Sequence, residues 1–159
     1  GSKDAQRYGR DEQDAVLMHI KRLQLKNRGV LLQPYLSRVD DAGETALMYF
    51  NGTFSHAIRK GPLLKRNVGP TEQLFAPEQI MARVPSADEL ALADSVVAAL
   101  PGIFELDGPL LYARIDLLRG DDAEPCLLEL ELTEPSLFFA YADGAADRFV
   151  AALKDRLSL

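Results

Sequence analysis

Residues 45–59 read TALMYFNGTFSHAIR, two largely apolar stretches on either side of Asn51-Gly52. Glycine adopts a positive φ without steric cost, and an Asn-Gly pair in this setting is the strongest short-range signal for a tight β-hairpin. The segment therefore predicts two antiparallel strands, Thr45 to Phe50 and Thr53 to Arg59, joined by a two-residue turn.

The sequence on both sides of this hairpin predicts a mixture of helices and strands. Apolar residues recur at helical spacing from Asp11 to about Lys26, with acids in the first turn and bases in the last. Val30 to Leu36 is a short apolar run that we expect to form a third strand. Further on we expect a long loop from Gly61 to Pro77. A helix is expected from Ser86, its N-cap, with Glu89 at the capping-box position, to Leu100, where Pro101 stops it. Two strands, Leu110 to Leu118 and Cys126 to Thr133, and a last helix, Ala145 to Leu157, follow. This order predicts an α+β fold, an antiparallel sheet flanked by helices.

Composition narrows the functional classes. The chain has 159 residues and a formal charge of −6, and its basic residues form no long run that would attract a phosphate backbone. One cysteine, Cys126, excludes an internal disulfide framework. No apolar run in the sequence is long enough to span a membrane, and we expect no secretory leader. We therefore expect a cytoplasmic, single-domain protein that acts without nucleic acid or membrane.

Chemistry is concentrated on the last predicted hairpin, which contains Arg114-Ile115-Asp116 and Glu129-Leu130-Glu131. Side chains two positions apart share one face of a strand, so three carboxylates and an arginine converge if the strands pair. Such oxygen ligands suit Mg²⁺ or Mn²⁺, and the arginine suits a phosphoryl group. The alternative is an ordinary solvated strand face on which acids alternate with leucine.

These motifs resemble the signature of the ATP-grasp superfamily. Its usual form is Arg-x-Asp on one strand and Glu-x-Asn on the next. Upstream, Val30 to Leu36 resembles the strand and hinge that meet adenine in that superfamily. Gly43 to Phe50 and Phe54 to Lys60 are similar to blocks of the branch that includes glutathione-synthetase-like enzymes and the cyclo-ligase of cycloserine biosynthesis. The similarity extends from about Gly29 to Phe138.

The resemblance implies a role for each matched residue. Asp116, Glu129 and Glu131 match the metal ligands, with Glu131 where the family usually has Asn. Arg114 matches the arginine near the transferred phosphate. Gln33, Tyr35 and Leu36 match the adenine hinge, and Leu128 matches its apolar floor. Asp40 matches the acid that binds the ribose, and Lys60 matches a basic residue at the end of a strand, near phosphate or the acyl substrate. Ser136 falls where some relatives touch the substrate, and we expect Glu44 to pair with the basic residues of the site.

The implied activity is an ATP- and Mg²⁺-dependent carboxylate–amine ligase that forms a C–N bond through an acyl phosphate. The resemblance further implies that residues 1–159 are the C-terminal portion of an ATP-grasp domain, without the N-terminal domain and first subdomain. We then expect the missing part of the ligase to be a partner. We also expect self-association, because the chain would expose the surface that the missing part covers in a whole ligase. Two alternatives stay open at this point: a non-catalytic nucleotide-binding fragment and an acidic interaction module.

Overall fold

The computed structural model describes residues 3–64, 69 and 79–158, so the predicted loop over 61–77 falls largely outside the described residues. The chain divides into a smaller unit, residues 1–35 and 63–77, and a larger unit, residues 36–62 and 78–159. The smaller unit contains α1 (Gln13–Gln24). The larger unit contains, in chain order, α2 (Val39–Ala42), β1 (Glu44–Phe50), β2 (Thr53–Lys60), β3 (Ile80–Arg83), α3 (Ala87–Ile103), β4 (Tyr112–Arg119), β5 (Pro125–Glu131), the 3₁₀ helix η1 (Phe139–Tyr141) and α4 (Ala145–Leu157).

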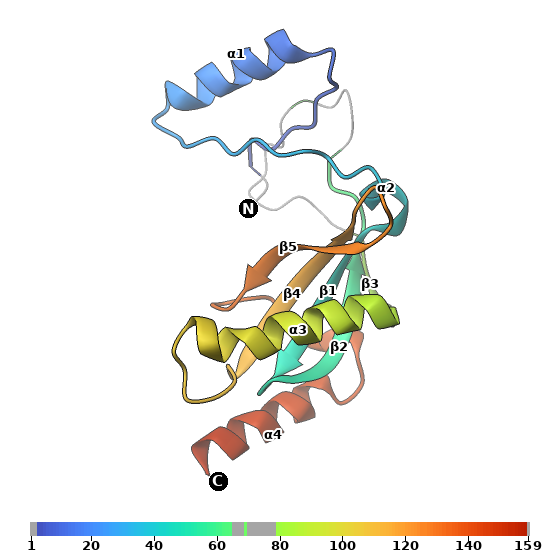
Figure 1. Ribbon diagram of the computed structural model, residues 1–159, viewed down its shortest axis with the longest axis vertical. Coiled ribbons are helices and arrows are strands. Elements are labelled where there is room, and N and C mark those ends of the chain that lie inside the picture. The colour runs from blue at the N-terminus through green and yellow to red at the C-terminus, as the bar shows by residue number, and fades with distance from the viewer. Residues whose placement is uncertain (1–2, 65–68, 70–78, 159) are drawn as a thin grey trace. The chain divides into compact units, whose positions relative to one another are not determined.

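The larger unit is built on a five-stranded antiparallel sheet in the order β3-β2-β1-β4-β5 (Figure 1). The predicted hairpin is confirmed: β1 pairs with β2, and the turn residues Asn51 and Gly52 have φ of 48° and 77°. Positive φ at both central positions gives the turn the twist of the flanking strands. The α+β class and the antiparallel sheet with flanking helices are likewise confirmed.

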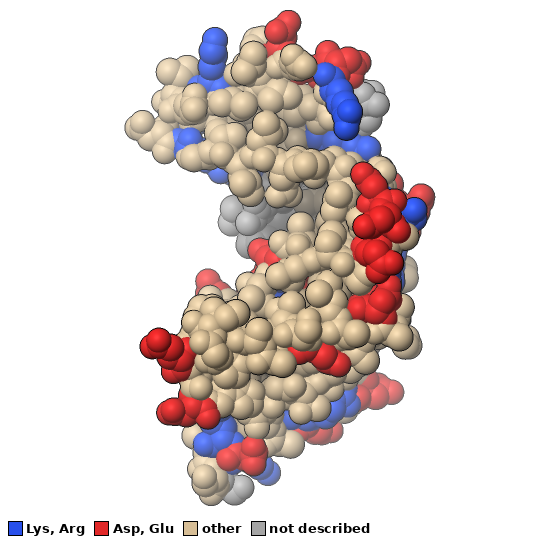
Figure 2. All heavy atoms as spheres, in the orientation of Figure 1, with Lys and Arg blue, Asp and Glu red and all other residues tan. Residues whose placement is uncertain are grey.

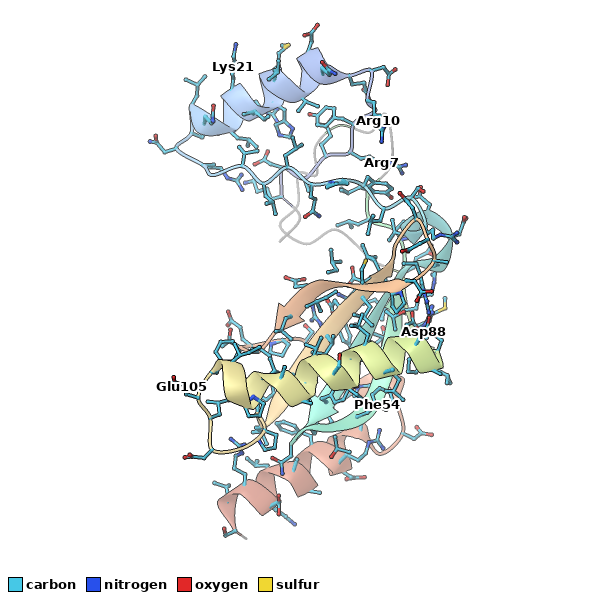
Figure 3. The ribbon with its side chains drawn as sticks, viewed as in Figure 1. Arg7, Arg10, Lys21, Phe54, Asp88 and Glu105 are labelled. Carbon is cyan, nitrogen blue, oxygen red and sulfur yellow. The ribbon has the colours of Figure 1, made fainter. Side chains whose placement is uncertain are left out.

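One face of the sheet forms the main apolar core under α3 (Figure 1). Alternate strand residues point toward this helix, and the buried members from strands and helix are Leu47, Tyr49, Ala57, Ala93, Val97, Leu100, Ala113, Ile115 and Leu117. Asp88 lies in the first turn of α3 and Glu105 just beyond its end (Figure 3). The helix covers this face, and the charged side chains Arg114 and Asp116 lie on the other face of the sheet.

The opposite face is apolar at one end and charged at the other. At the Phe50 end, Phe149 of α4 packs edge-on against Phe50, with ring centroids 5.2 Å apart, and Phe139 of η1 packs against both. In the middle, Leu137 and Phe138 pack over Ala46, Met48 and Ile58. The far end, where β1 begins and β2 ends, carries charged side chains instead.

Several predicted boundaries are corrected by the structure. Val30 to Leu36 is not a strand; its run contains Pro34, which has no N–H to donate, and no strand in the described part of the chain pairs with it. Helix α3 continues through Pro101 to Ile103. Proline removes only its own backbone hydrogen bond, and the Phe104 N–H still donates to the Leu100 carbonyl at 3.0 Å. The short elements α2 and β3 were not predicted.

The smaller unit is held mainly by polar contacts among its described residues. Tyr8 Oη lies 2.7 Å from His19 Nδ1 on α1, Arg28 pairs with Asp4, and the Arg7 guanidinium lies 3.6 Å from the Tyr35 ring centroid. The predicted helix over Asp11 to Lys26 is confirmed, slightly shorter at both ends. Across all described helices, none combines the length and apolar character needed to cross a bilayer.

Glu89 joins α3 to the sheet and is 2% exposed. Its carboxylate accepts hydrogen bonds from Thr45 Oγ1 at 2.8 Å, Arg83 Nη2 at 3.1 Å and the Ser86 backbone N–H at 2.9 Å, and so completes the predicted capping box. Burying a carboxylate is tolerated only because each of its oxygens is satisfied in this way.

We therefore expect Glu89→Ala to lower the free energy of unfolding by about 3 kcal/mol, since it leaves buried donors unpaired. Chemical denaturation followed by circular dichroism measures this. Asp88→Ala is the matched control, because Asp88 is an exposed acid of the same helical turn and its partner Arg119 keeps its bonds to Ser86 Oγ and the Ala123 carbonyl. Equal losses in the two variants would contradict the role given to Glu89.

Candidate metal and phosphate site

Strand pairing brings the three predicted metal ligands together. Arg114 on β4 is the cross-strand partner of Glu131 on β5, and Asp116 is the partner of Glu129. Carboxylate oxygens of Asp116, Glu129 and Glu131 all lie within 4.8 Å of one another. The predicted convergence of three carboxylates beside an arginine is therefore present, with a donor set of hard oxygens that suits Mg²⁺ or Mn²⁺.

A β-bulge sets this register. The pairing shifts between Asp116 and Leu117, so that Leu117 opposes Leu127 and Leu128 is the extra residue of β5. A bulge changes which face the following side chains occupy. Here the shift lets Leu130 pack against the core under α3 while both acids of β5 oppose the charged side chains of β4.

Asp116 is fully buried, with 0% of its surface exposed. Arg114 binds it with two hydrogen bonds, Nε to Oδ1 and Nη2 to Oδ2, each 2.8 Å long. Lys60 Nζ donates a further bond to Oδ2 at 2.8 Å. Burial acts to raise the pKa of Asp116, but the hydrogen bonds and positive charges of Arg114 and Lys60 outweigh it and hold that pKa below its ordinary value.

Lys60 lies between two carboxylates at the charged end of the sheet. Besides Asp116, its ammonium group contacts Glu44 Oε1 at 2.5 Å, which confirms the predicted pairing of Glu44 with a basic residue of the site. Burial and the neighbouring Asp116 raise the pKa of Glu44 to about 7, against the lowering influence of Lys60. Lys60 itself keeps a raised pKa, because its two carboxylate partners outweigh its burial.

Glu131 links the arginine to the outer part of the site. Arg114 Nη2 donates to Glu131 Oε1 at 2.5 Å, while Glu129 is more exposed. Burial raises the pKa of Glu131, with Glu129 and Asp116 adding to the rise and Arg114 opposing it. Carboxylates thus crowd one another here, a situation that an added cation relieves.

Residues 132–138, which follow β5, fold back over the face of the sheet that carries Arg114. Two side chains bind successive carbonyl groups of this segment. Arg114 Nη1 donates to the Ser136 carbonyl at 3.4 Å, and His56 Nε2 donates to the Leu137 carbonyl at 2.9 Å. His56 Nδ1 accepts from the Ser55 hydroxyl at 2.9 Å. Through these contacts His56 holds the backbone at Leu137, and Arg114 holds Ser136 beside it.

The residues matched to the nucleotide are distributed over both units. Gln33 and Tyr35 belong to the smaller unit; Leu36, Asp40 and Leu128 belong to the larger one, where Asp40 lies in α2 and Leu128 is the bulged residue of β5. Gln33 is exposed and Leu128 is 39% exposed. The roles of all five in nucleotide binding remain predictions.

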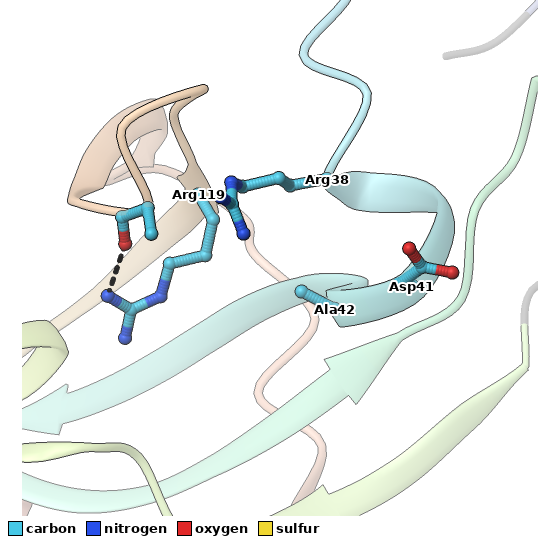
Figure 4. A pocket seen from close by; sticks show the side chains of 5 residues that line it. Arg38, Asp41, Ala42 and Arg119 are labelled. Carbon is cyan, nitrogen blue, oxygen red and sulfur yellow. Dashed lines mark hydrogen bonds between the residues drawn. The ribbon is translucent and has the colours of Figure 1, made fainter.

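A second polar feature was not predicted from sequence. A cavity of about 340 Å³ is lined by Arg38, Asp41, Ala42, Arg119 and Ala123 (Figure 4). Arg119 points toward α3, where it pairs with Asp88, and Arg38 donates to the Asp121 carbonyl. Acidic side chains gather on the surface near α2 in Figure 2. The lining residues are scattered along the sequence, so no motif marks the cavity.

Because Asp116 compensates two buried cations, we expect Asp116→Ala to lower the free energy of unfolding by about 4 kcal/mol in the presence of EDTA. The exposed Glu129→Gln variant should change it by less than about 0.5 kcal/mol. Urea denaturation of both variants measures this. An Asp116→Ala variant as stable as the unmodified chain would show that the acids are only a solvated strand face.

His56 gives the chain a pH-dependent component of stability. Burial lowers its pKa below the ordinary value, and the Leu137 carbonyl only partly offsets this. The unfolded chain therefore takes up a proton more readily, and the folded state loses stability as pH falls below about 6.5. We expect the unfolding midpoint to drop less between pH 7.5 and 5.5 in His56→Gln than in the unmodified chain; parallel pH profiles would contradict this.

Comparison with known proteins agrees with this geometry. No family model matches the chain. It is 41% identical to the cycloserine biosynthesis protein DcsG of Streptomyces lavendulae over 158 residues, which are 98% of this chain and 52% of that protein. The crystal structure of D-cycloserine synthetase DcsG superposes with a TM-score of 0.86 over the same shares of the two chains.

A more distant structure shares the fold. D-alanine–D-alanine ligase from Bacillus anthracis, solved in complex with ATP, gives a TM-score of 0.54 at 17% identity and covers 95% of this chain and 49% of that one. The chain thus spans about half the length of the relatives it matches. The chain is a relative of DcsG over about half of that protein's length, and its five-stranded sheet with flanking helices matches part of an ATP-grasp structure.

Proposed function

We propose that this chain carries the metal and adenine half-site of an ATP- and Mg²⁺-dependent ligase that joins a carboxylate to an amine. The observation that carries the proposal is the meeting of Asp116, Glu129 and Glu131, with oxygens within 4.8 Å of one another, next to an arginine on the paired strand. The relationship to DcsG supports assigning this cluster to ATP chemistry rather than to a solvated surface.

Asp116, Glu129 and Glu131 are the residues that would hold Mg²⁺ or Mn²⁺. The cation would neutralise charge on the nucleotide phosphates. The carboxylates differ in burial. Asp116 is buried and fixed by Arg114 and Lys60, whereas Glu129 is exposed and can reorient toward a ligand. In this proposal Asp116 fixes the position of the ion, and Glu129 adjusts to it.

Arg114 is the proposed catalytic residue. Its guanidinium group is oriented by both oxygens of Asp116, by Glu131 and by the Ser136 carbonyl. A cation that is already oriented costs no reorganisation when negative charge develops on a transferring phosphoryl group. Positioning and charge stabilisation account for most catalysis of phosphoryl transfer, so no covalent enzyme intermediate is needed.

The nucleotide itself would be held by the residues that the family resemblance matches to it. In this proposal the backbone around Gln33, Tyr35 and Leu36 meets adenine, and Leu128 forms an apolar floor. Asp40 binds the ribose, and the Lys60 ammonium group contacts a phosphate. Lys60 is supported best, because its ammonium group already lies 2.8 Å from a carboxylate of the proposed metal site.

The reaction would proceed in two displacements. A substrate carboxylate oxygen attacks the γ-phosphorus of ATP and ADP leaves, which gives an acyl phosphate. The amine nitrogen then attacks the acyl carbon, and inorganic phosphate leaves with the C–O electron pair. Because the chain spans about half of its relatives, we propose that contacts to the carboxylate and amine come largely from a further part of the ligase, in the cytoplasm where ATP is supplied.

Calorimetric titration with ADP, with and without Mg²⁺, tests the half-site. We expect Mg²⁺-dependent binding that Glu129→Gln weakens by about tenfold, since it removes an exposed ligand charge without disturbing the buried network. Glu124→Gln is the matched control, an exposed glutamate next to β5 with the same change in charge. Equal effects of the two variants, or ADP binding independent of Mg²⁺, would overturn the proposal.

A further inference from the structure

Lys60 is an unusually constrained cation. The residue is 7% exposed, and its ammonium group contacts Asp116 at 2.8 Å and Glu44 at 2.5 Å. It reaches Asp116 from β2 across β1, where the residue paired with Asp116 is Ala46, whose side chain is small. A buried ammonium group is tolerated only with such partners, so Lys60 is committed to the carboxylates.

The hydrogen-bonding capacity of Asp116 is nearly used up. A carboxylate offers about four lone-pair positions on its two oxygens. Oδ2 accepts from both Lys60 and Arg114, and Oδ1 accepts from Arg114. A divalent cation that uses the remaining position on Oδ1 would lie close to two positive charges, so its binding is weakened unless one of them moves away.

The two cations differ in how firmly they are held. Arg114 forms a fork on Asp116 and also binds Glu131 and the Ser136 carbonyl, so its planar group cannot leave without breaking several bonds. Lys60 makes one bond to Asp116 and one to Glu44, both from a single compact ammonium group on a flexible four-carbon stem. Its ammonium group is also a good phosphate ligand, because it is a compact charge that can turn to a new acceptor. Lys60 is therefore the cation that moves.

We infer that Lys60 is an internal counter-ion that competes with a divalent cation for Asp116 and yields to it when phosphate oxygens accept the ammonium group. This inference rests on the proposed function, since it needs both a cation and a nucleotide at the site. Free Mg²⁺ then binds weakly, because it must approach an ammonium group that its bond to Glu44 keeps beside Asp116. The cation–nucleotide complex binds better, because its phosphates receive Lys60 as the metal reaches Asp116.

The test compares Mn²⁺ alone with Mn²⁺ and ADP, using the electron paramagnetic resonance signal of free Mn²⁺. Lys60→Met removes the competing charge, and we expect it to bind Mn²⁺ alone about tenfold more tightly than the unmodified chain. In the presence of ADP the advantage should vanish or reverse, because the variant has lost its phosphate ligand. Lys60→Arg is the matched control that keeps the charge and should bind Mn²⁺ alone as weakly as lysine.

The outcomes separate this inference from the proposed function. Mn²⁺ binding that depends on Glu129 but is equal or weaker in Lys60→Met would overturn the counter-ion role and leave the metal site in place. Failure of every variant to bind Mn²⁺, with or without ADP, would overturn both. Circular dichroism verifies folding; should Lys60→Met not fold, Lys60→Gln makes the same comparison with a neutral side chain that still donates to Asp116.

Discussion

A carboxylate removed from solvent, Asp116, is the constraint on which the charged end of the sheet depends. Its burial would be prohibitive without compensation, and the compensating groups come from its own strand and from β2, two strands away in the sheet. The strand order β2-β1-β4 is therefore tied to the chemistry, because only that order carries Lys60 over the small side chain of Ala46 to Asp116. The network is at once a structural tie between three strands and the centre of the proposed site.

One face of the sheet forms the core that stabilises the fold, and the other face carries the proposed site. Leu47, Ile115 and Leu117 fill the face under α3, and Glu89 anchors that helix to β1 through Thr45. On the other face, aromatic packing around Phe50 ends where Lys60 and Asp116 begin. An apolar core behind the strands holds the charged residues in register, and the segment containing Ser136 is bound to the same face by Arg114 and His56. The proposed catalytic arginine is thus supported on rigid elements rather than on a free loop.

Local patterns in the sequence predicted much of this structure and missed what depends on distant partners. The Asn51-Gly52 turn, the Ser86–Glu89 capping box and the acids of β4 and β5 are encoded within short segments, and each is present. Val30 to Leu36 had strand-like composition, yet a strand also needs a neighbour to pair with. The bond from Lys60 to Asp116 joins residues 56 positions apart, and the cavity lined by Arg38 and Arg119 is equally non-local, so neither leaves a signal in sequence spacing.

The bulge at Leu128 bears on how this hairpin can change length during evolution. The loss of one residue from β5 on the turn side of Glu129 could be absorbed by removing the bulge, with both acids still opposite Arg114 and Asp116. The deletion of a residue between Glu129 and Glu131 could not be absorbed in this way, because it would turn one of the two acids toward the apolar face under α3. Insertions and deletions in homologous sequences should therefore accumulate before Glu129 and be absent from the Glu-x-Glu segment itself.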